Sequence, residues 1–170
     1  MHRALLRFLV LPFCLLVFSC STRKTGENQV FYLNYSAGTV ESLDPAYAKN
    51  LYNMWTDHML YNTLVETDEH LQVVPSLAKS WSVSDDGLRY TFHLRNDVFF
   101  HDNEVFPDGK GRKVTAQDVV YSFNRLIDPA VASTGAWIFN DRVAEKLPFY
   151  AVDDTTFQIT LREPFRPLPE

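Results

Sequence analysis

Residues 81–95 read Trp-Ser-Val-Ser-Asp-Asp-Gly-Leu-Arg-Tyr-Thr-Phe-His-Leu-Arg, and this stretch decides the fold. Its centre carries the pair Asp86-Gly87, which supplies the positive φ that a tight hairpin turn requires. The segment after the turn alternates polar residues with three apolar ones that share a face: Tyr90, Phe92 and Leu94. Strict alternation is typical of a strand with one buried face. The stretch therefore predicts an antiparallel hairpin in a half-buried sheet.

A helix is predicted before this hairpin, from Ala46 to about Leu64. Asp44 is suited to cap its start, and Pro45 suits the first helical position. Five apolar residues recur at helical spacing: Tyr47, Leu51, Trp55, Met59 and Leu60. We expect this stripe to pack in the core.

Further strands and turns are expected on either side of that helix. Residues 30–35 are rich in β-forming residues and predict a first strand. Residues 64–75 hold a polar turn between two short apolar pieces and resemble a hairpin. Ser76 is suited to cap a short helical turn over residues 77–80.

The second half of the chain is expected to begin with a long exposed loop over residues 101–113. The segment Thr115 to Asp118 resembles a capping box, with an acid at N3 in place of Glu or Gln. An apolar stripe then predicts a helix to about Ile127, which Asp128-Pro129 ends. A looser segment follows over residues 130–150, and alternation predicts a last strand over residues 155–161.

The composition is that of an ordinary globular protein of one domain. The chain has 170 residues, of which 46% are hydrophobic and 22% charged. Removing the two arginines of residues 1–19 from the 16 basic residues leaves 14 against 21 acidic ones, a net charge of −7. That charge argues against nucleic acid or anionic lipid as the main partner.

The N-terminal residues 1–19 have the layout of a secretory signal. Arg3 and Arg7 precede an apolar run over residues 8–18, which as a helix would span about 16 Å against a hydrocarbon core of about 30 Å. The sequence Val-Phe-Ser-Cys at 17–20 resembles a lipobox, so we expect cleavage before Cys20 and its acylation. The alternative is that Cys20 is a plain buried thiol after an ordinary signal.

The residues that follow the cysteine are expected to be a tether, over residues 20–29. They are polar throughout and show no apolar periodicity. No cysteine occurs from Ser21 to Glu170, so no disulfide is possible in the mature domain.

Motifs of enzymes are absent from the sequence. It has no Gly-x-Ser-x-Gly elbow, no His-Glu-x-x-His and no dinucleotide-type glycine fingerprint. Residues 109–113 lack the spacing of a phosphate loop and are interpreted as a solvated loop. His93, His101 and Asp102 have side chains that can bind a metal, but a strand and a loop give no reason to place all three around one ion. We predict no metal site and no cofactor.

A set of motifs carries a family resemblance. In chain order they are Leu43-Asp44-Pro45-Ala46, Tyr61-Asn62-Thr63-Leu64-Val65, Val74-Pro75-Ser76-Leu77-Ala78-Lys79-Ser80-Trp81, the stretch 85–95, Val98-Phe99-Phe100-His101-Asp102, the stretch 115–123 and Pro164-Phe165. In this order they resemble the peptide- and nickel-type extracellular solute-binding proteins of ABC importers. The resemblance covers about residues 30–168. One departure is the insertion-like segment Glu104 to Arg112, which lengthens a loop.

The resemblance implies a fold of the α/β class, a mixed sheet with flanking helices that is part of a two-lobed periplasmic-binding-protein-like type II fold. Residues 30–170 would form its N-terminal part, and most charged ligand anchors of such proteins lie in the other part. The local candidates for ligand contact are Ser36, Gly38 and Thr39, in the loop after the predicted first strand, where small residues let a ligand approach the backbone. The alternative for these three is an ordinary turn into the Asp44-Pro45 cap.

The resemblance also implies a function. We expect an exported, lipid-anchored receptor on the periplasmic or cell-surface side of a bacterial membrane, not an enzyme. It would capture oligopeptides or a similar small solute by hinge closure and deliver them to ABC permease subunits. Two alternatives stay open: a truncated non-transporting lipoprotein or sensor module of the same fold, and an exported metal-dependent enzyme.

Overall fold

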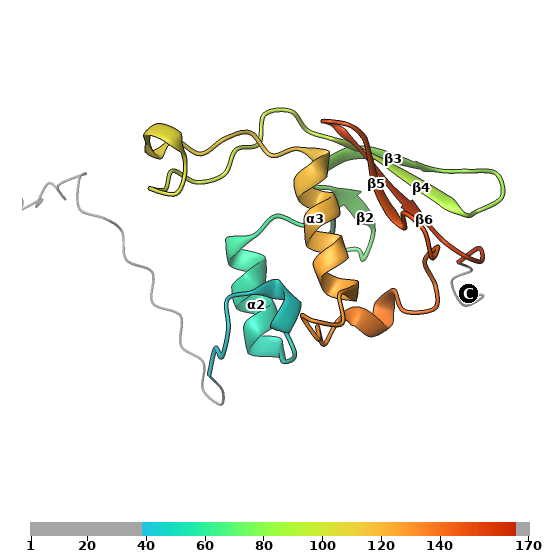
Figure 1. The fold of residues 1–170 in the computed structure, drawn as a ribbon, viewed down its shortest axis with the longest axis horizontal. Coiled ribbons are helices and arrows are strands. Elements are labelled where there is room, and N and C mark those ends of the chain that lie inside the picture. The colour runs from blue at the N-terminus through green and yellow to red at the C-terminus, as the bar shows by residue number, and fades with distance from the viewer. Residues whose placement is uncertain (1–38, 166–170) are drawn as a thin grey trace, which may run out of the picture. The chain divides into compact units, whose positions relative to one another are not determined.

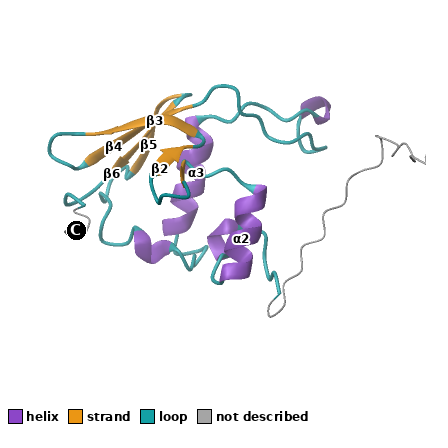
Figure 2. Cartoon of the chain, turned by 180° about the vertical axis from the view of Figure 1, so that it is seen from behind, coloured by secondary structure: helices purple, strands orange, loops and turns teal. Residues whose placement is uncertain are grey.

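The computed structural model describes residues 39–165, which all lie within one compact unit, Tyr35–Glu170. The predicted signal, Cys20, the tether, the first strand, Ser36 and Gly38 lie outside the described residues. The elements in chain order are η1 (Pro45–Tyr47), α2 (Leu51–Leu60), β1 (Val65–Thr67), β2 (Val73–Pro75), β3 (Ala78–Val83), β4 (Arg89–Leu94), η2 (Pro107–Gly109), α3 (Ala116–Ile127), η3 (Ala136–Ile138), β5 (Phe149–Asp153) and β6 (Thr156–Thr160). Their arrangement is shown in Figures 1 and 2.

A four-stranded antiparallel sheet forms the centre of the described unit, in the order β3-β4-β6-β5. Its first hairpin is the predicted one: Gly87 has φ +71°, and its N–H donates to the Ser84 carbonyl at 2.8 Å. The predicted hairpin over residues 64–75 is confirmed as the separate antiparallel pair β1-β2. The mixed α/β class is therefore confirmed, with antiparallel pairing throughout the described sheets.

Helix α3 packs against β5 and β6 and covers part of one face of the sheet (Figure 1). Its start is fixed by Asp118, whose carboxylate accepts from the Thr115 N–H at 2.8 Å. An aromatic cluster lies beneath it: the Phe123 ring centroid is 5.2 Å from those of both Phe149 and Phe157. Phe149 and Phe157 are fully buried, so the hydrophobic core lies between α3 and these strands.

The opposite face of the sheet is polar, as the alternation predicts. Register places Thr91 opposite Gln158, and the Gln158 amide donates to the Thr91 hydroxyl at 3.1 Å. His93 is exposed on β4. The sheet is thus half buried, with its apolar side chains directed toward α3.

The predicted helix from Ala46 to Leu64 differs from the structure in extent and in orientation. The structure has a single 3-10 turn, η1, followed by extended backbone at Ala48 and a new helix start at Asn50, whose side chain accepts from the Asn53 N–H at 2.9 Å. The prediction that the apolar stripe packs in the core is wrong. Its members are exposed, and α2 buries Asn53 and Asp57 instead.

Two other predictions need correction. The helical turn expected over residues 77–80 is absent, because residues 78–83 form β3 and pair with β4. The looser segment predicted over residues 130–150 ends two residues too late, because Phe149 and Tyr150 already belong to β5, which pairs with β6. In both cases pairing with a neighbouring strand decides the conformation more strongly than local capping signals.

The long loop predicted over residues 101–113 is exposed but ordered. The arm, residues 99–113, is closed by a hydrogen bond of 2.9 Å from the Phe100 N–H to the Arg112 carbonyl. Figure 1 shows it projecting away from the sheet. Gly111 is required there, because a Cβ at this position would lie 1.8 Å from the Phe100 carbonyl oxygen. Among residues 39–165, no helix has the length and apolar character that crossing a membrane requires.

Candidate functional site

The segment before α2 carries Thr39, the one predicted ligand-contacting residue that the structure describes. Thr39 is exposed. Two residues later the Glu41 N–H donates to the Asn53 side-chain oxygen at 3.2 Å, and Lys49 pairs with the Glu41 carboxylate at 2.6 Å. The backbone two residues after Thr39 is therefore hydrogen-bonded to α2.

A clasp formed by Asp44 and Arg125 joins this segment to the C-terminal end of α3. The guanidinium donates to both carboxylate oxygens, at 3.0 and 2.7 Å. The Ala46 N–H also donates to the Asp44 carboxylate at 3.0 Å, and the Ser133 hydroxyl donates to the Ala46 carbonyl at 2.7 Å. The Arg125 hydrogen bonds lower the pKa of Asp44, with a smaller contribution from the Ala46 N–H. The same contact raises the pKa of Arg125.

Next to the clasp, α2 buries two polar side chains. Asn53 is 0% exposed and Asp57 is 7% exposed. The Asn53 side-chain nitrogen and both Asp57 carboxylate oxygens have no hydrogen-bond partner. Burial raises the pKa of Asp57, and the negative charge of Asp44 raises it further. Buried polar groups without partners are uncommon in folded proteins, so burying these groups lowers the stability of this part of the unit.

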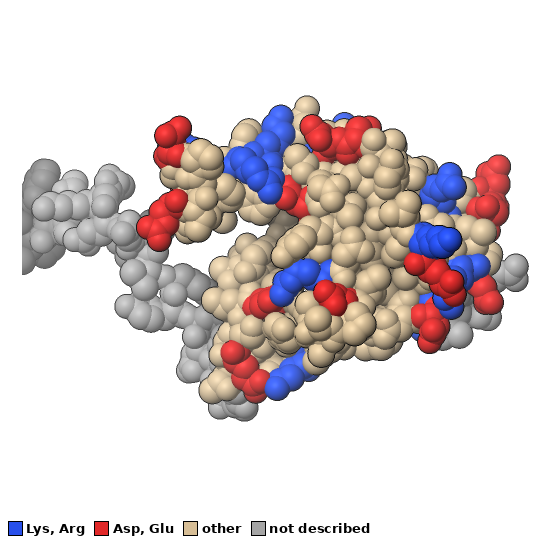
Figure 3. Space-filling model, viewed as in Figure 1, with Lys and Arg blue, Asp and Glu red and all other residues tan. Residues whose placement is uncertain are grey.

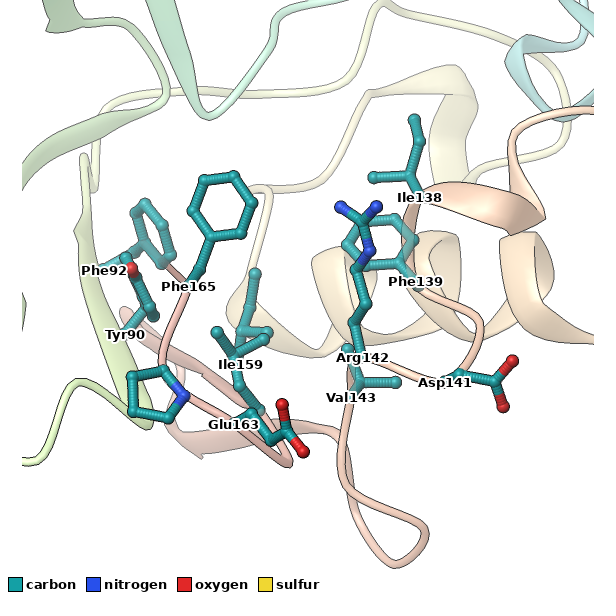
Figure 4. A pocket seen from close by; sticks show the side chains of 12 residues that line it. Tyr90, Phe92, Ile138, Phe139, Asp141, Arg142, Val143, Ile159, Glu163 and Phe165 are labelled. Carbon is teal, nitrogen blue, oxygen red and sulfur yellow. The ribbon is translucent and has the colours of Figure 1, made fainter. Parts of the chain in front are cut away.

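A hollow of about 790 Å³ opens on the apolar face of the sheet, between strands β4 and β6 and residues 138–143. Its lining residues are Tyr90, Phe92, Ile138, Phe139, Asp141, Arg142, Val143, Ile159, Leu161, Glu163, Pro164 and Phe165. In Figure 4 the strands supply one side and residues 138–143 the other, with the Phe165 side chain between them. Most of the lining is apolar, and Asp141, Arg142 and Glu163 supply its charged groups. Such a surface suits an apolar side chain or segment with a polar border.

Side chains that could together bind a metal ion do not gather in the described part of the chain. No three His, Cys, Asp or Glu side chains among residues 39–165 lie close enough to hold a metal ion. His93 lies on the polar face of β4, whereas His101 lies in the arm, and both are exposed. Asp102, the third candidate metal ligand, is instead paired with Lys110 at 2.7 Å within the arm.

Some residues of these features could be predicted from the sequence, and others could not. The sequence indicates Thr39 and the cap at Asp44, while Cys20, Ser36 and Gly38 lie outside the described residues. The hollow could not be predicted, because its lining residues Tyr90, Phe92 and Ile159 show the same alternation as residues of a buried core. Nor could Arg125, which looks like an ordinary exposed charge at the end of a helix.

The chain matches the family described as "Bacterial extracellular solute-binding proteins, family 5 Middle" over residues 72–170, which is more than half of its length. The chain belongs to this family. Among family 5 relatives, the probable di/tripeptide-binding protein 5 of Pseudomonas aeruginosa is 53% identical over 73 residues, 42% of this chain and 14% of that protein. The dipeptide-binding protein of Escherichia coli is 39% identical over 118 residues, 64% of this chain and 21% of that protein.

Solved structures show the same likeness. A Helicobacter pylori periplasmic binding protein in complex with the peptide STSA is 34% identical, with a TM-score of 0.60 over 72% of this chain and 25% of that chain. The Escherichia coli murein tripeptide binding protein is 33% identical, with a TM-score of 0.60 over 73% and 25%. These periplasmic binding proteins have the type II fold, so the predicted fold is confirmed. The family and these relatives are described as solute-binding or peptide-binding proteins, not as enzymes. The matches span only a quarter or less of these relatives.

Proposed function

We propose that this family 5 chain is part of an extracytoplasmic receptor that binds oligopeptides or a similar small solute and delivers them to the permease subunits of an ABC importer. The likeness to a binding protein solved with a bound peptide, together with the family match over residues 72–170, carries this proposal. Residues 30–170 would supply the N-terminal part of the solute-binding domain. Capture would occur by closure of the two lobes around the solute.

Ser36, Gly38 and Thr39 are proposed to contact the backbone of the solute. The described part of this loop supports the assignment, because Thr39 is exposed and leads directly into a segment held on α2 and α3. A binding loop carried on a fixed segment loses less conformational entropy when it binds. The clasp at Asp44 would therefore position the loop without touching the solute.

Anchoring to the membrane is proposed to occur through lipid on Cys20, after removal of residues 1–19, with residues 20–29 as the tether. Several acyl chains on one cysteine make attachment effectively permanent. Radiolabelled palmitate should enter the protein in cells that make it, and Cys20→Ser should abolish the labelling. Labelling of the Cys20→Ser protein, or none in the unaltered protein, would contradict the anchor.

Solute binding is tested with the protein purified from the membranes of the cells that make it. Native mass spectrometry should detect co-purified di- to oligopeptides, and deletion of the gene should reduce uptake of radiolabelled peptides. Thr39→Arg should weaken binding by about tenfold or more, which corresponds to about 1.4 kcal/mol. Thr67→Arg is the matched control, since Thr67 is also exposed but lies on β1, and it should bind normally.

The possible outcomes separate the alternatives. Binding without any change in uptake would favour a sensor module or a non-transporting lipoprotein of the same fold. No bound peptide or other solute, with unchanged uptake, would contradict the receptor assignment.

A further inference from the structure

Strand β5 forms one outer edge of the four-stranded sheet, because β6 pairs with only one side of it. The Thr160 N–H donates to the Pro148 carbonyl at 2.8 Å, so the even-numbered residues here direct their backbone groups toward β6. The backbone N–H and C=O groups of Phe149 and Ala151 point the other way. They have no hydrogen-bond partner within residues 39–165. The outer edge of β5, which we define as residues 149–151, is therefore unpaired in the described unit.

This edge has little protection against pairing. Edge strands are usually protected by proline or by charged residues within the strand. The sequence of β5 is Phe-Tyr-Ala-Val-Asp, with no proline and with its one charge at the last position. Tyr150 and Val152 are each 49% exposed. The register shifts between Ala151 and Asp153, so a bulge at Val152 confines regular pairing to the outer edge of β5.

A second copy of β5 fits this edge in one antiparallel register. Phe149 then lies opposite the partner's Ala151, and Ala151 opposite the partner's Phe149. Each of these pairs exchanges both N–H···O=C bonds, so every free backbone group of the edge is used. A shift of two residues in one direction brings in Leu147, whose φ of +51° is not that of a strand, and a shift in the other direction brings in the bulge.

The charges at the two ends of β5 also favour an antiparallel copy. At the start of the strand Glu145 is paired with Arg162 at 2.7 Å, which leaves Lys146 without an ion-pair partner among the described residues. Asp153 and Asp154 lie at the other end, and Figure 3 shows acidic groups gathered where β5 turns into β6. An antiparallel copy brings each Lys146 toward the acidic end of the other strand. A parallel copy would bring like charges together.

A groove beside the same edge provides further surface for a second copy. It has a volume of about 290 Å³ and lies between residues 147–151 and the α3 residues Gln117, Val120 and Asn124. A two-fold axis perpendicular to the sheet keeps both α3 helices on one face. The partner's α3 would therefore lie beside this groove and cover Leu147, which is 71% exposed.

We infer that the outer edge of β5 is an interface between two copies of this chain, joined by antiparallel pairing of β5 with the partner's β5. The sheet of one copy would continue into the sheet of the other. The free backbone groups, the single matching register and the complementary charges each support a second copy as the occupant. The inference goes beyond the proposed function and does not depend on solute binding.

A cysteine at the centre of the register tests the pairing. Tyr150 would face the partner's Tyr150 in a pair without backbone hydrogen bonds, where Cα atoms are about 4.5 Å apart, a distance that a disulfide can span. The protein is purified from the membranes of the cells that make it and treated with a mild oxidant. Tyr150→Cys should give several-fold more disulfide-linked dimer on non-reducing gels than Ser82→Cys.

Ser82→Cys is the matched control for this cross-link. Ser82 is exposed and lies on the same face of the sheet as Tyr150, but on β3, the opposite outer strand. The unaltered protein measures any background that arises from Cys20.

A proline in the outer edge of β5 provides the second measurement. Ala151→Pro removes an outward N–H and no hydrogen bond to β6, and proline is tolerated at such positions of edge strands. It should reduce the Tyr150→Cys cross-link several-fold and leave the far-ultraviolet circular dichroism unchanged. In sedimentation, the unaltered protein should be a dimer and Ala151→Pro a monomer.

An exchange of charges tests the direction of the pairing without altering the backbone. Lys146→Glu should weaken the dimer several-fold, because the acidic ends then face a like charge. Lys146→Glu combined with Asp154→Lys should restore it. This pair of variants decides the matter should Ala151→Pro change the circular dichroism.

Other results would overturn the inference. These are a monomer in sedimentation, a cross-link no stronger than that of Ser82→Cys, a cross-link that persists in Ala151→Pro, and a dimer that is indifferent to the charge exchange. A β5-linked dimer of a protein that binds no peptide would leave the inference standing and contradict the proposed function alone.

Discussion

Replacing Phe157 by alanine tests whether the cluster between α3 and the sheet is the stabilising core. Phe157 is 0% exposed in β6, with ring centroids 5.2 Å from Phe123, 6.1 Å from Phe92 and 6.4 Å from Phe149. Truncating a buried phenylalanine removes its burial free energy and leaves a cavity, at a cost of about 3–5 kcal/mol. A unit of 127 described residues has a free energy of unfolding of roughly 6–19 kcal/mol, so the loss is a large fraction.

Urea unfolding followed by circular dichroism measures this loss. With m of about 1–3 kcal/mol/M, the unfolding midpoint should fall by roughly 1–5 M in Phe157→Ala. Phe99→Ala is the matched control, because Phe99 is 58% exposed in the arm and its loss should cost less than about 0.5 kcal/mol. A Phe157→Ala protein that unfolds at the same urea concentration as the Phe99→Ala protein would refute the assignment of the core.

Three further predictions concern single sites. Gly111→Ala should open the arm and speed hydrogen exchange at the Phe100 amide, because the new Cβ meets the Phe100 carbonyl, whereas Gly135→Ala, with its nearest neighbour at 3.6 Å, should not. Asp118→Asn should cost about 1 kcal/mol in urea unfolding at pH 7. The Arg112 guanidinium donates to the Asp118 carboxylate at 2.7 Å and lowers the pKa of Asp118. The stabilisation is therefore present above the ordinary carboxyl pKa, and this cost should vanish as the pH falls through the lowered pKa. Burial raises the pKa of Asp57, so ionisation of this carboxyl destabilises the fold, and the loss is complete once the pH exceeds the raised pKa. Asp57→Asn should therefore raise the urea midpoint at pH 7 but not at pH 3. An unchanged midpoint at pH 7 would contradict this.

Features that depend on neighbouring residues in the chain could be predicted from the sequence. The turn at Gly87 needs a residue that tolerates positive φ, and the start of α3 needs Asp118 three positions after Thr115. In each case, all of the residues that determine the local structure lie within a few positions of one another. The family motifs extend this local information to the whole fold, which the comparisons confirm.

Features that depend on distant partners could not be predicted in this way. Periodicity shows that α2 has an apolar side, but it does not show whether that side faces the sheet, and the burial of Asp57 reverses the expected orientation. Strand β5 is short and follows Leu147, which has positive φ, so only its pairing with β6 reveals it. The hollow needs residues 138–143 to be placed opposite β4, and no local signal provides that.

The pairing of β4 with β6 has a consequence for how the chain folds. The paired residues are 63 to 71 positions apart in sequence, whereas β3-β4 and β5-β6 are local hairpins. Closing so long a loop is slow compared with forming the hairpins or α3. During synthesis, a chain that has reached residue 150 therefore holds β4 with one edge unpaired and apolar side chains uncovered. That edge is where a chaperone would be expected to bind, and where nascent chains would aggregate without one.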